Sequence, residues 1–372
     1  MKIAVIKKDY LCNGGGAERY AMEICRRLTI AGHQVYVHSR RFVEDRQTGI
    51  IHVPVRQKVF GAFSSTHSFH KSVQKVISPG DYDVIYSLSR TYPTDVHRVT
   101  ESLHCEWMKI RYSPFQLFNP RHIEILSLEK DIFKIQNTRY VVCNSELTKK
   151  QIIKNYEYPE EKIYVIRNGV NKEEFYPASD HERINLRRKL DLNKSNFVIL
   201  FAASNFRIKG LDFAMKALVH LPEILRKQVI LLVAGGGRAD YFRKIAQKLN
   251  VNDNIRFLGY VASMRELYVS SDILLHPVLY EPFANVCIEA LACGLPVITT
   301  RNNGASELIN EGENGFLVDS ADQVELIAEK IVKFADLSGM RNKIIVNALK
   351  TVEKLSWEQH IEKLLEIFKK LK

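Results

Sequence analysis

The sequence predicts an α/β protein made of two doubly wound domains, each with a mostly parallel sheet. The chain has 372 residues, and a single hydrophobic core usually stops growing at about 250 to 300 residues. Short apolar, β-branched runs alternate with amphipathic stretches of helical length along the whole chain, as they do in parallel sheets with helical crossovers. Between Val170 and Ser195 this alternation lapses into Asn-Gly, a proline and mixed charges, which indicates a domain boundary.

The first half, assigned to a domain of residues 1–172, contains six apolar runs that predict strands. These runs lie at 2–7, 34–39, 50–55, 83–87, 139–144 and 162–167. Amphipathic stretches between them predict helices near 17–31, 68–77, 120–137 and 145–155.

The second half, residues 173–356, repeats the same pattern. Strands are predicted near 196–203, 228–234, 254–258, 272–276 and 296–300, and helices near 210–220, 238–249, 264–270, 284–293 and 322–335. A last amphipathic stretch, 357–371, has no strand after it and is expected to pack back on the first domain. Open α/β sheets bind ligands at the carboxyl ends of their strands, so two such domains facing one another would place an active site in the cleft between them.

Composition favours a cytoplasmic, globular protein. The chain is 46% hydrophobic and 26% charged, and its longest apolar runs are of strand length, far below the roughly 20 residues of a membrane-spanning helix. The first residues lack the features of a signal peptide. The net charge is +12, and residues 1–176 carry 27 Lys and Arg against 19 Asp and Glu, which is +8 of that excess. A basic surface attracts phosphates of several kinds, so the sign alone does not choose a partner.

The most specific motif runs from Glu281 to Ile298. A strand ends near His276, Pro282 suits the first turn of a helix, and Gly294 suits its end. Backbone N–H groups at such a helix start form a positive site for a phosphate or a hydroxyl-rich ligand. Glu281 lies at this helix start, and Glu289 lies about two turns further along.

This motif, Glu-x7-Glu followed by Ala-x-x-x-Gly-x-Pro-Val, resembles the signature of the retaining glycosyltransferases of family 4, which have the GT-B fold of two Rossmann-like domains. The resemblance implies that Glu281 hydrogen-bonds the donor sugar and that Glu289 binds the nucleotide ribose. It implies further that the backbone amides from Phe283 to Val286, including Ala284 and Asn285, help to hold the donor. Other matching segments, in order, are Gly14-Gly15-Gly16-Ala17-Glu18, Asn168-Gly169-Val170, Lys209-Gly210 and Gly304-Ala305-Ser306-Glu307.

The glycine loop at residues 14–16 follows the first strand and opens a helix. Without Cβ atoms, its amides can approach a ligand closely, and the resemblance implies that Gly15 and Gly16 face the donor diphosphate and the acceptor. Neither Gly14-x-Gly16-x-x-Arg19 nor Gly235-x-Gly237-x-x-Asp240 has the third glycine of a dinucleotide site, so an NAD site is disfavoured.

Lys209 occupies the position of the family's lysine, where an ammonium group would neutralise the departing diphosphate. The usual upstream arginine is absent, because Ser204 and Asn205 stand in that region. Arg207 is the alternative second cation, and a solvated surface arginine is an equally good interpretation of it.

The segment Arg98–Trp107 is expected to leave a strand and to carry a group that lies beside the reacting sugar carbon in relatives. Both Glu101 and His104 match versions of that pattern, and the sequence does not rank them. Asp81-Tyr82-Asp83 resembles a metal-binding D-x-D of another fold, but it directly precedes a predicted strand, where acids commonly close turns. No metal and no other cofactor are therefore expected, and the six cysteines show no paired spacing typical of zinc sites.

The stretch Trp107–His122 mixes aromatic, aliphatic and basic residues, which is typical of contact with an anionic membrane surface and equally of a packed insertion. This stretch resembles the membrane-facing region of the lipopolysaccharide-core glucosyltransferases, a subgroup that the chain also resembles in its Lys209-Gly210 and final-domain segments. We therefore expect a retaining hexosyltransferase with a nucleotide-diphosphate sugar, UDP-glucose or a related donor, and a glycan or lipid-linked acceptor. The alternatives are a sugar-nucleotide epimerase on the same fold, and a non-catalytic binder of phosphate or nucleic acid. The last is disfavoured because no basic-aromatic repeat or helix-turn-helix pattern is present.

Overall fold

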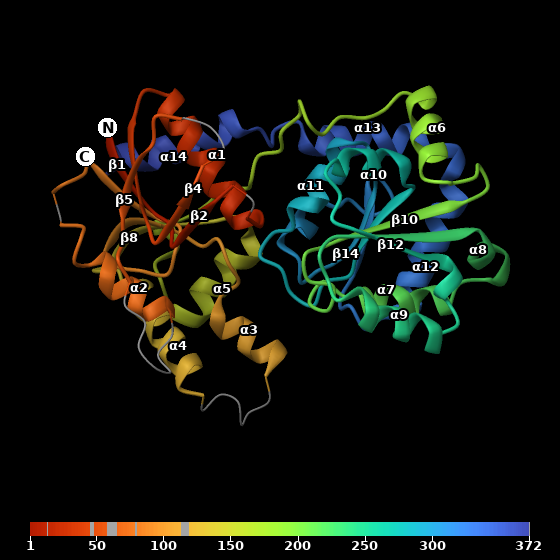
Figure 1. The fold of residues 1–372 in the computed structure, drawn as a ribbon, viewed down its shortest axis with the longest axis horizontal. Helices are drawn as coiled ribbons and strands as arrows, with labels where there is room; N and C mark the ends of the chain where they lie inside the picture. Colours follow the sequence, from red (N-terminus) through yellow and green to blue (C-terminus); the bar gives the residue numbers. More distant parts are fainter. Residues whose placement is uncertain (13, 45–47, 58–64, 79, 113–118, 372) are drawn as a thin grey trace. The chain divides into compact units, whose positions relative to one another are not determined.

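The chain forms two compact units in the computed structural model, which describes residues 1–12, 14–44, 48–57, 65–78, 80–112 and 119–371. Unit 1 comprises Met1–Asn168 and Glu358–Lys372, and unit 2 comprises Gly169–Trp357. Each unit is a parallel sheet with helices on both of its faces (Figure 1).

Unit 1 contains a seven-stranded sheet in the order β5-β3-β1-β6-β7-β8-β9. Its strands are β1 (Lys2–Ile6), β3 (Gln34–Ser39), β5 (Ile51–Pro54), β6 (Val84–Ser87), β7 (Thr94–Arg98), β8 (Thr138–Cys143) and β9 (Ile163–Val165), and every pair of neighbours is parallel. Two short strands, β2 (Asp9–Leu11) and β4 (Arg41–Val43), form a small separate sheet. The chain builds outward from β1 in one direction and then returns to add β6 on its other side, so the strand order reverses between β1 and β6.

The helices of unit 1 cover both faces of its sheet. They are α1 (Gly16–Ile30), α2 (Ser65–Val73), α3 (His104–Arg111), α4 (Pro120–Ile132), α5 (Glu146–Tyr156) and α14 (Trp357–Lys369), with a 3-10 turn at Glu160–Lys162. Residues from α4, α5 and β8 share one buried cluster, which includes Leu128, Val141 and Ile152.

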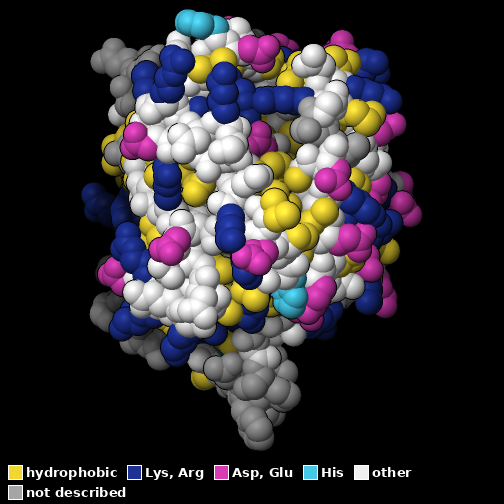
Figure 2. Space-filling model, turned by 90° about the vertical axis from the view of Figure 1, so that its right-hand side faces the viewer, with side chains coloured by type: hydrophobic (Ala, Val, Ile, Leu, Met, Phe, Trp, Pro, Cys, Tyr) yellow, Lys and Arg dark blue, Asp and Glu magenta, His cyan; other side chains and the backbone are white. Residues whose placement is uncertain are grey.

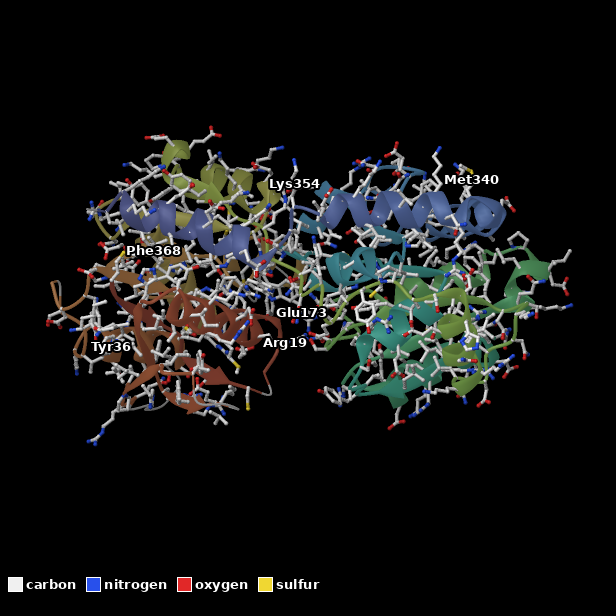
Figure 3. The ribbon with its side chains drawn as sticks, turned by 90° about the horizontal axis from the view of Figure 1, so that it is seen from above. Arg19, Tyr36, Glu173, Met340, Lys354 and Phe368 are labelled. Carbon is white, nitrogen blue, oxygen red and sulfur yellow. The ribbon has the colours of Figure 1, made fainter. Side chains whose placement is uncertain are left out.

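The C-terminal helix α14 belongs to unit 1 although it follows unit 2 in sequence. His360 Nε2 lies 2.9 Å from the hydroxyl of Tyr20, and His360 Nδ1 lies 2.8 Å from the carbonyl oxygen of Arg167. The ring of Phe368, labelled on α14 in Figure 3, meets the ring of Tyr86 with centroids 5.5 Å apart. These buried contacts make α14 part of the core of unit 1.

Unit 2 contains a six-stranded sheet in the order β12-β11-β10-β13-β14-β15. Its strands are β10 (Phe197–Ala202), β11 (Val229–Ala234), β12 (Ile255–Gly259), β13 (Ile273–His276), β14 (Val297–Thr300) and β15 (Gly315–Val318), and all neighbours are parallel. Here the order reverses between β10 and β13.

The helices of unit 2 form two layers. They are α6 (Asp180–Lys189), α7 (Leu211–Val219), α8 (Glu223–Gln228), α9 (Ala239–Lys248), α10 (Met264–Ser270), α11 (Asn285–Ala292), α12 (Val324–Asp336) and α13 (Arg341–Val352), with 3-10 turns at Asn252–Asn254, Gly304–Leu308 and Leu337–Met340. Figure 1 shows α10, α11 and α13 on one face of the sheet and α7, α9 and α12 on the other. Each layer has its own buried cluster, because alternate strand residues point to opposite faces. On the side of unit 2 that Figure 2 shows, basic and acidic side chains are interspersed.

Several elements were not predicted from the sequence. Strand β7 reads Thr-Asp-Val-His-Arg, and these mostly polar residues lack the apolar run on which strand prediction relies, yet Val96, His97 and Arg98 are all buried. Helix α6 lies within the stretch interpreted as a linker. Its Arg183 and Arg187 are buried against Asp272 and backbone carbonyls, so this helix is anchored by ion pairs that composition does not reveal.

Candidate active site

The carboxyl edge of the unit 2 sheet brings together two predicted site residues at the point where the strand order reverses. Lys209 follows β10, and Glu281 follows β13, the neighbouring strand. Their side chains form an ion pair and are 19% and 21% exposed. Ligands of open α/β sheets bind at such reversals, so this ion pair marks the candidate donor site.

Gly210 lets Lys209 approach this position. Its φ is +83°, in the left-handed region, and a Cβ atom there would lie 1.9 Å from the carbonyl oxygen of Pro277. The amide of Leu279 also donates to the carbonyl of Ile208 at 3.3 Å. The loops after β10 and β13 are therefore packed directly on one another.

We expect Gly210→Ala to lower the free energy of unfolding by at least about 2 kcal/mol, because the left-handed backbone alone costs about 1 to 2 kcal/mol for a residue with a Cβ. The clash with Pro277 adds to that cost. Chemical denaturation measures the change. Gly259→Ala is the matched control, since its φ is +69° and no atom lies within 4 Å of the added Cβ. Equal losses in both variants would show that the contact with Pro277 is unimportant.

Asn303 fixes the loop that carries Glu281. The backbone of Glu281 pairs with the segment after β14 through its amide, which donates to Asn302 at 3.0 Å, and its carbonyl, which accepts from Gly304 at 2.9 Å. The fully buried side-chain oxygen of Asn303 accepts from the amides of Ala284 and Ala305, each at 3.1 Å. Asn303 was not among the site residues predicted from the sequence. Its signal was a polar Arg-Asn-Asn-Gly run directly after the strand predicted near 296–300.

Helix α11 carries Glu289 on the same side as α10. The hydroxyl of Tyr268 donates to Glu289 Oε2 at 2.7 Å, and burial raises the pKa of Tyr268 well above its usual value. Glu289 is thus held in place by a neutral donor. Of the amides predicted to hold a donor, that of Ala284 already donates to Asn303, so Ala284 is a support for the loop in this structure. The other predicted amides lie next to Ala284 in the chain: Phe283 precedes it, and Asn285 and Val286 are the first two residues of α11.

The electrostatics of the site centre on Lys209. Burial lowers the pKa of Lys209 to about 8, while its contact with Glu281 favours the charged form. His276, the last residue of β13, is 2% exposed, and neither ring nitrogen has a hydrogen-bond partner within the part of the chain that the structure describes. Burial and the nearby Lys209 lower the pKa of His276 to about 3, so its ring is neutral. Arg207, in contrast, is exposed.

Unit 1 places the glycine loop at the carboxyl edge of its own sheet. The loop leads from β2 into α1, whose N-cap is Gly15 and whose first residue is Gly16. A Cβ on Gly14 would lie 2.3 Å from the Cβ of Glu18, and Glu18 forms a 3.1 Å ion pair with the buried Lys7. The amino terminus of α1 therefore already has one carboxylate beside it.

Glu101 and His104 lie in the same connection, after β7. Glu101 is 59% exposed and pairs with Arg90 at 2.5 Å, and Arg90 lowers the pKa of Glu101. His104 begins α3, is 8% exposed, and lies 3.1 Å from a ring nitrogen of His122. Burial, followed by Arg90, lowers the pKa of His104 to about 4, so the ring is neutral. Glu101 is the more accessible of the two candidates.

Other features of the structure do not suggest a second reaction centre. Asp81 accepts from the amide of Ser78 at 3.2 Å and so holds a local turn, whereas Asp83 accepts from the amide of Lys2 at 2.7 Å and ties the residue before β6 to the start of β1. Across the described ranges, no group of three His, Cys, Asp or Glu side chains could hold a metal ion. A cavity of about 360 Å³ in unit 2 lies at the opposite, amino edge of the sheet, beside Phe197, Asp272 and Pro296.

Comparison with protein families identifies the chain. Residues 182–351 match the model of glycosyl transferases group 1, and residues 14–174 match the model of glycosyltransferase family 4. The chain belongs to the glycosyltransferases. Both models lie in the order that the sequence motifs indicated, and together they match most of the chain.

Two curated relatives are similar to this glycosyltransferase. It is 25% identical over 333 residues to the lipopolysaccharide glucosyltransferase WaaG of Escherichia coli K12, covering 88% of each chain. It is 33% identical over 235 residues to an uncharacterized glycosyltransferase of Methanocaldococcus jannaschii. That match covers 62% of this chain and 59% of the relative's length.

Solved structures confirm the predicted fold class, two Rossmann-like parallel sheets of the GT-B type. The crystal structure of WaaG, described as a glycosyltransferase involved in lipopolysaccharide biosynthesis, superposes with a TM-score of 0.86 over 98% of this chain and 99% of its own, at 23% identity. Anabaena HepE in complex with UDP superposes with a TM-score of 0.78 over the full length of both chains, at 21% identity.

Proposed function

We propose that this glycosyltransferase transfers a hexose from a nucleotide-diphosphate sugar, UDP-glucose or a related donor, to a glycan or lipid-linked acceptor such as a lipopolysaccharide core. The observation that carries the proposal is the pairing of Lys209 with Glu281 at the strand reversal of unit 2. The ammonium group suits the anionic diphosphate of such a donor, and the carboxylate beside it suits the hydroxyl groups of the sugar. The relatives support the choice: WaaG is named a glucosyltransferase, and HepE has been crystallised with UDP-glucose.

In the proposed donor complex, the diphosphate takes Lys209 and the sugar hydroxyls take Glu281. Binding therefore exchanges the internal ion pair for contacts with the substrate. Glu289, fixed by Tyr268, accepts hydrogen bonds from the ribose, and the amides of Phe283, Asn285 and Val286 contribute donors at the positive end of α11. Arg207 is a second cation on the same loop, available to the outer phosphate. In unit 1, the amides of Gly15 and Gly16 would face the diphosphate.

We propose that transfer retains the configuration at the anomeric carbon. The bond from that carbon to the diphosphate oxygen breaks, and the acceptor oxygen bonds to the same face. The proton of the acceptor hydroxyl passes to the departing phosphate oxygen, so the diphosphate leaves with one added proton. Lys209 stabilises the charge that develops on it. Glu101, which is exposed on unit 1, would orient the acceptor, while neutral His104 would serve as a hydrogen-bond partner.

The experiment that tests this function combines ligand screening with product analysis. UDP-, GDP- and ADP-glucose are compared by thermal shift, because a ligand at 100 times its dissociation constant stabilises the folded protein by about 2.7 kcal/mol. The stabilising donor is then incubated with and without a truncated lipopolysaccharide core. Sugar transfer only with acceptor supports the proposal. A rearranged free sugar in both reactions would indicate an epimerase, and no stabilisation by any of the nucleotides would contradict donor binding.

Activity is expected to persist in excess EDTA. Lys209 and the start of α11 would supply the positive charge that a divalent ion supplies in other transferases. Initial rates with and without chelator measure this, with manganese and magnesium added back in separate reactions. If chelation abolishes turnover and one of these ions restores it, Lys209 alone does not neutralise the negative charge of the departing diphosphate.

We further propose peripheral attachment to an anionic membrane through α3 and the start of α4. None of the helices that the structure describes is long and apolar enough to cross a bilayer, so attachment would be at the surface. Residues 113–118 of the predicted Trp107–His122 contact lie outside the described residues. Within α3, Ile110 is 41% exposed, Arg111 lies 5.9 Å from the ring of Trp107, and Lys109 pairs with Glu106 at 2.5 Å.

If this attachment is electrostatic, each Lys or Arg near the surface contributes about 1 kcal/mol, screened over about 8 Å at physiological salt. Lys109→Ser combined with Arg111→Ser should then reduce co-sedimentation with anionic vesicles, and high salt should do the same. Transfer to a soluble acceptor fragment should not change. Equal co-sedimentation with neutral and anionic vesicles would rule out this mode of attachment.

A further inference from the structure

Arg90 ties together three parts of unit 1 around Glu101. It follows β6, and its side chain is 19% exposed. One terminal nitrogen, Nη1, donates to Glu101 Oε2 at 2.5 Å, and the other, Nη2, donates to the carbonyl oxygen of Ser102 at 2.7 Å. Its Nε donates to Glu129 Oε1 at 3.5 Å. A guanidinium group is planar and rigid, so these contacts together fix the orientation of Arg90 and of the Glu101 carboxylate.

Glu129 anchors Arg90 from the interior of unit 1. It lies on α4 and is 2% exposed. Its Oε1 also accepts from the amide of His104 at 2.8 Å, and its Oε2 accepts from the amide of Cys105 at 3.1 Å and from the hydroxyl of Tyr156 at 2.5 Å. A carboxylate at the start of a helix is stabilised by the free amides and the helix dipole, and α3 receives no side-chain hydrogen bond from its own N-cap residue. Glu129 therefore holds Arg90 and the start of α3 as one unit.

The pair of Arg90 and Glu101 adds little to folding but can define where a carboxylate lies. Ion pairs that include an exposed side chain contribute little to stability, and Glu101 is 59% exposed. An exposed glutamate without a partner samples several rotamers, because its side chain is long and flexible. Arg90 has a buried anchor, so it can restrict Glu101 without being displaced itself.

Arg90 also influences the charge of Glu101. It has the largest influence on the pKa of Glu101 and lowers it, while partial desolvation acts in the opposite direction and Lys7 and Lys8 lower the pKa further. His97, which lies beside the same residues, is neutral because burial lowers its pKa to about 3. Loss of Arg90 should therefore raise the pKa of Glu101, and the carboxylate would become protonated at a higher pH.

The space behind Glu101 is too small for a sugar. Arg90, Glu101 and Glu129 line a cavity of about 20 Å³, together with His97 and Phe133, and a cavity of this size holds about one water molecule. An acceptor sugar is much larger, so it would reach Glu101 from its exposed side. In that arrangement Arg90 acts on the acceptor through Glu101.

We propose that Arg90 is a positioning residue that holds the Glu101 carboxylate in one orientation for a hydroxyl group of the acceptor, and that Glu129 anchors Arg90. The inference rests on the proposed function, since it takes Glu101 as the group that orients the acceptor. A carboxylate that is ionised and held in place accepts a hydrogen bond from a hydroxyl group more strongly than a mobile or protonated one.

Steady-state kinetics of the full-length enzyme test this role, with the donor that stabilises the protein and a truncated lipopolysaccharide core. Arg90→Met should lower kcat/KM for the acceptor roughly tenfold, the usual effect of one charge-assisted hydrogen bond, while the Kd for the donor stays the same. The fall of kcat/KM at low pH should begin at a higher pH than in the unmodified enzyme, because the pKa of Glu101 rises. Arg90→Lys keeps the charge and should restore the pH profile.

Arg139→Met is the matched control. Arg139 is 55% exposed near the start of β8 and pairs with Asp95 at 3.7 Å, so this variant also removes an arginine from an ion pair of unit 1. Its kinetics should equal those of the unmodified enzyme.

A double variant, Arg90→Met with Glu101→Gln, separates positioning from a structural role. A positioning residue acts through Glu101, so the double variant should be no slower than Glu101→Gln alone, and Arg90→Met should no longer shift the pH profile. A purely structural role would lower the activity by the same factor in both backgrounds. If Arg90→Met does not fold, the same cycle is run with Arg90→Lys, which should lose part of the activity only when Glu101 is present.

Three results would overturn the inference: equal losses in the two backgrounds, a pH profile that Arg90→Met leaves unchanged, and weaker donor binding in Arg90→Met, which would assign Arg90 to the donor. Failure of the proposed function gives a different result, since the unmodified enzyme would then transfer no sugar. Normal transfer by Glu101→Gln in an otherwise active enzyme would refute the positioning role alone.

Discussion

Glu281→Gln is expected to reduce turnover by about two to three orders of magnitude, the usual cost of losing one preorganised group at a reacting centre. The amide has nearly the size of the carboxylate, so the loop held by Asn303 should keep its shape. What is lost is the charge that accepts hydrogen bonds from the donor sugar and pairs with Lys209. Nucleotide affinity should change little, because the sugar contact and not the nucleotide contact is removed.

The control for this variant is Glu325→Gln, an acid-to-amide change at a residue in the first turn of α12 whose side chain is 71% exposed. Its turnover should equal that of the unmodified enzyme. Single-turnover rates at saturating donor separate chemistry from binding in both variants. If Glu281→Gln turns over normally, the carboxylate has no part in the reaction and the assignment of the sugar subsite is wrong.

Lys209→Met is expected to lower the transfer rate by about two to three orders of magnitude, as Glu281→Gln does, because the diphosphate would lose its main cation. For the same reason the variant should also bind the donor more weakly. The methionine side chain retains much of the apolar stem, so the packing of the loop should be preserved. Lys216→Met, on the neighbouring helix α7, is a matched control. A variant with an unchanged rate and unchanged donor affinity would remove Lys209 from the site.

The pKa of Lys209 makes the same prediction testable by pH. Burial lowers this pKa to about 8, and the cationic form is the one that binds a diphosphate. Donor affinity should therefore be constant well below pH 8 and fall as the pH rises through that value. Glu281→Gln removes the carboxylate that favours the ammonium form, so in that variant the fall should begin at lower pH. Lys209→Met should show no such dependence.

Part of the site could be predicted because its geometry is local. The spacing from Glu281 to Glu289 is a property of one loop and one helix, and Gly294 and Pro296 close that helix within a few residues. The alternation of apolar runs with amphipathic stretches likewise predicts parallel sheets from neighbouring residues alone. These signals fail where a strand is polar, as in β7, or where a helix is anchored by buried arginines, as in α6.

Residue patterns along the chain were enough to predict the fold class, the order of the two parallel sheets, and the residues from which a donor site could be built. The contacts of the site depend on the tertiary structure: Lys209 and Glu281 form an ion pair, and the side chain of Asn303 accepts from the amide of Ala284. Each of these contacts depends on which strands become neighbours in the sheet. The packing of helices on the two faces of each sheet determines which strands become neighbours. This packing joins residues far apart in the chain, so no local pattern of residues predicts it.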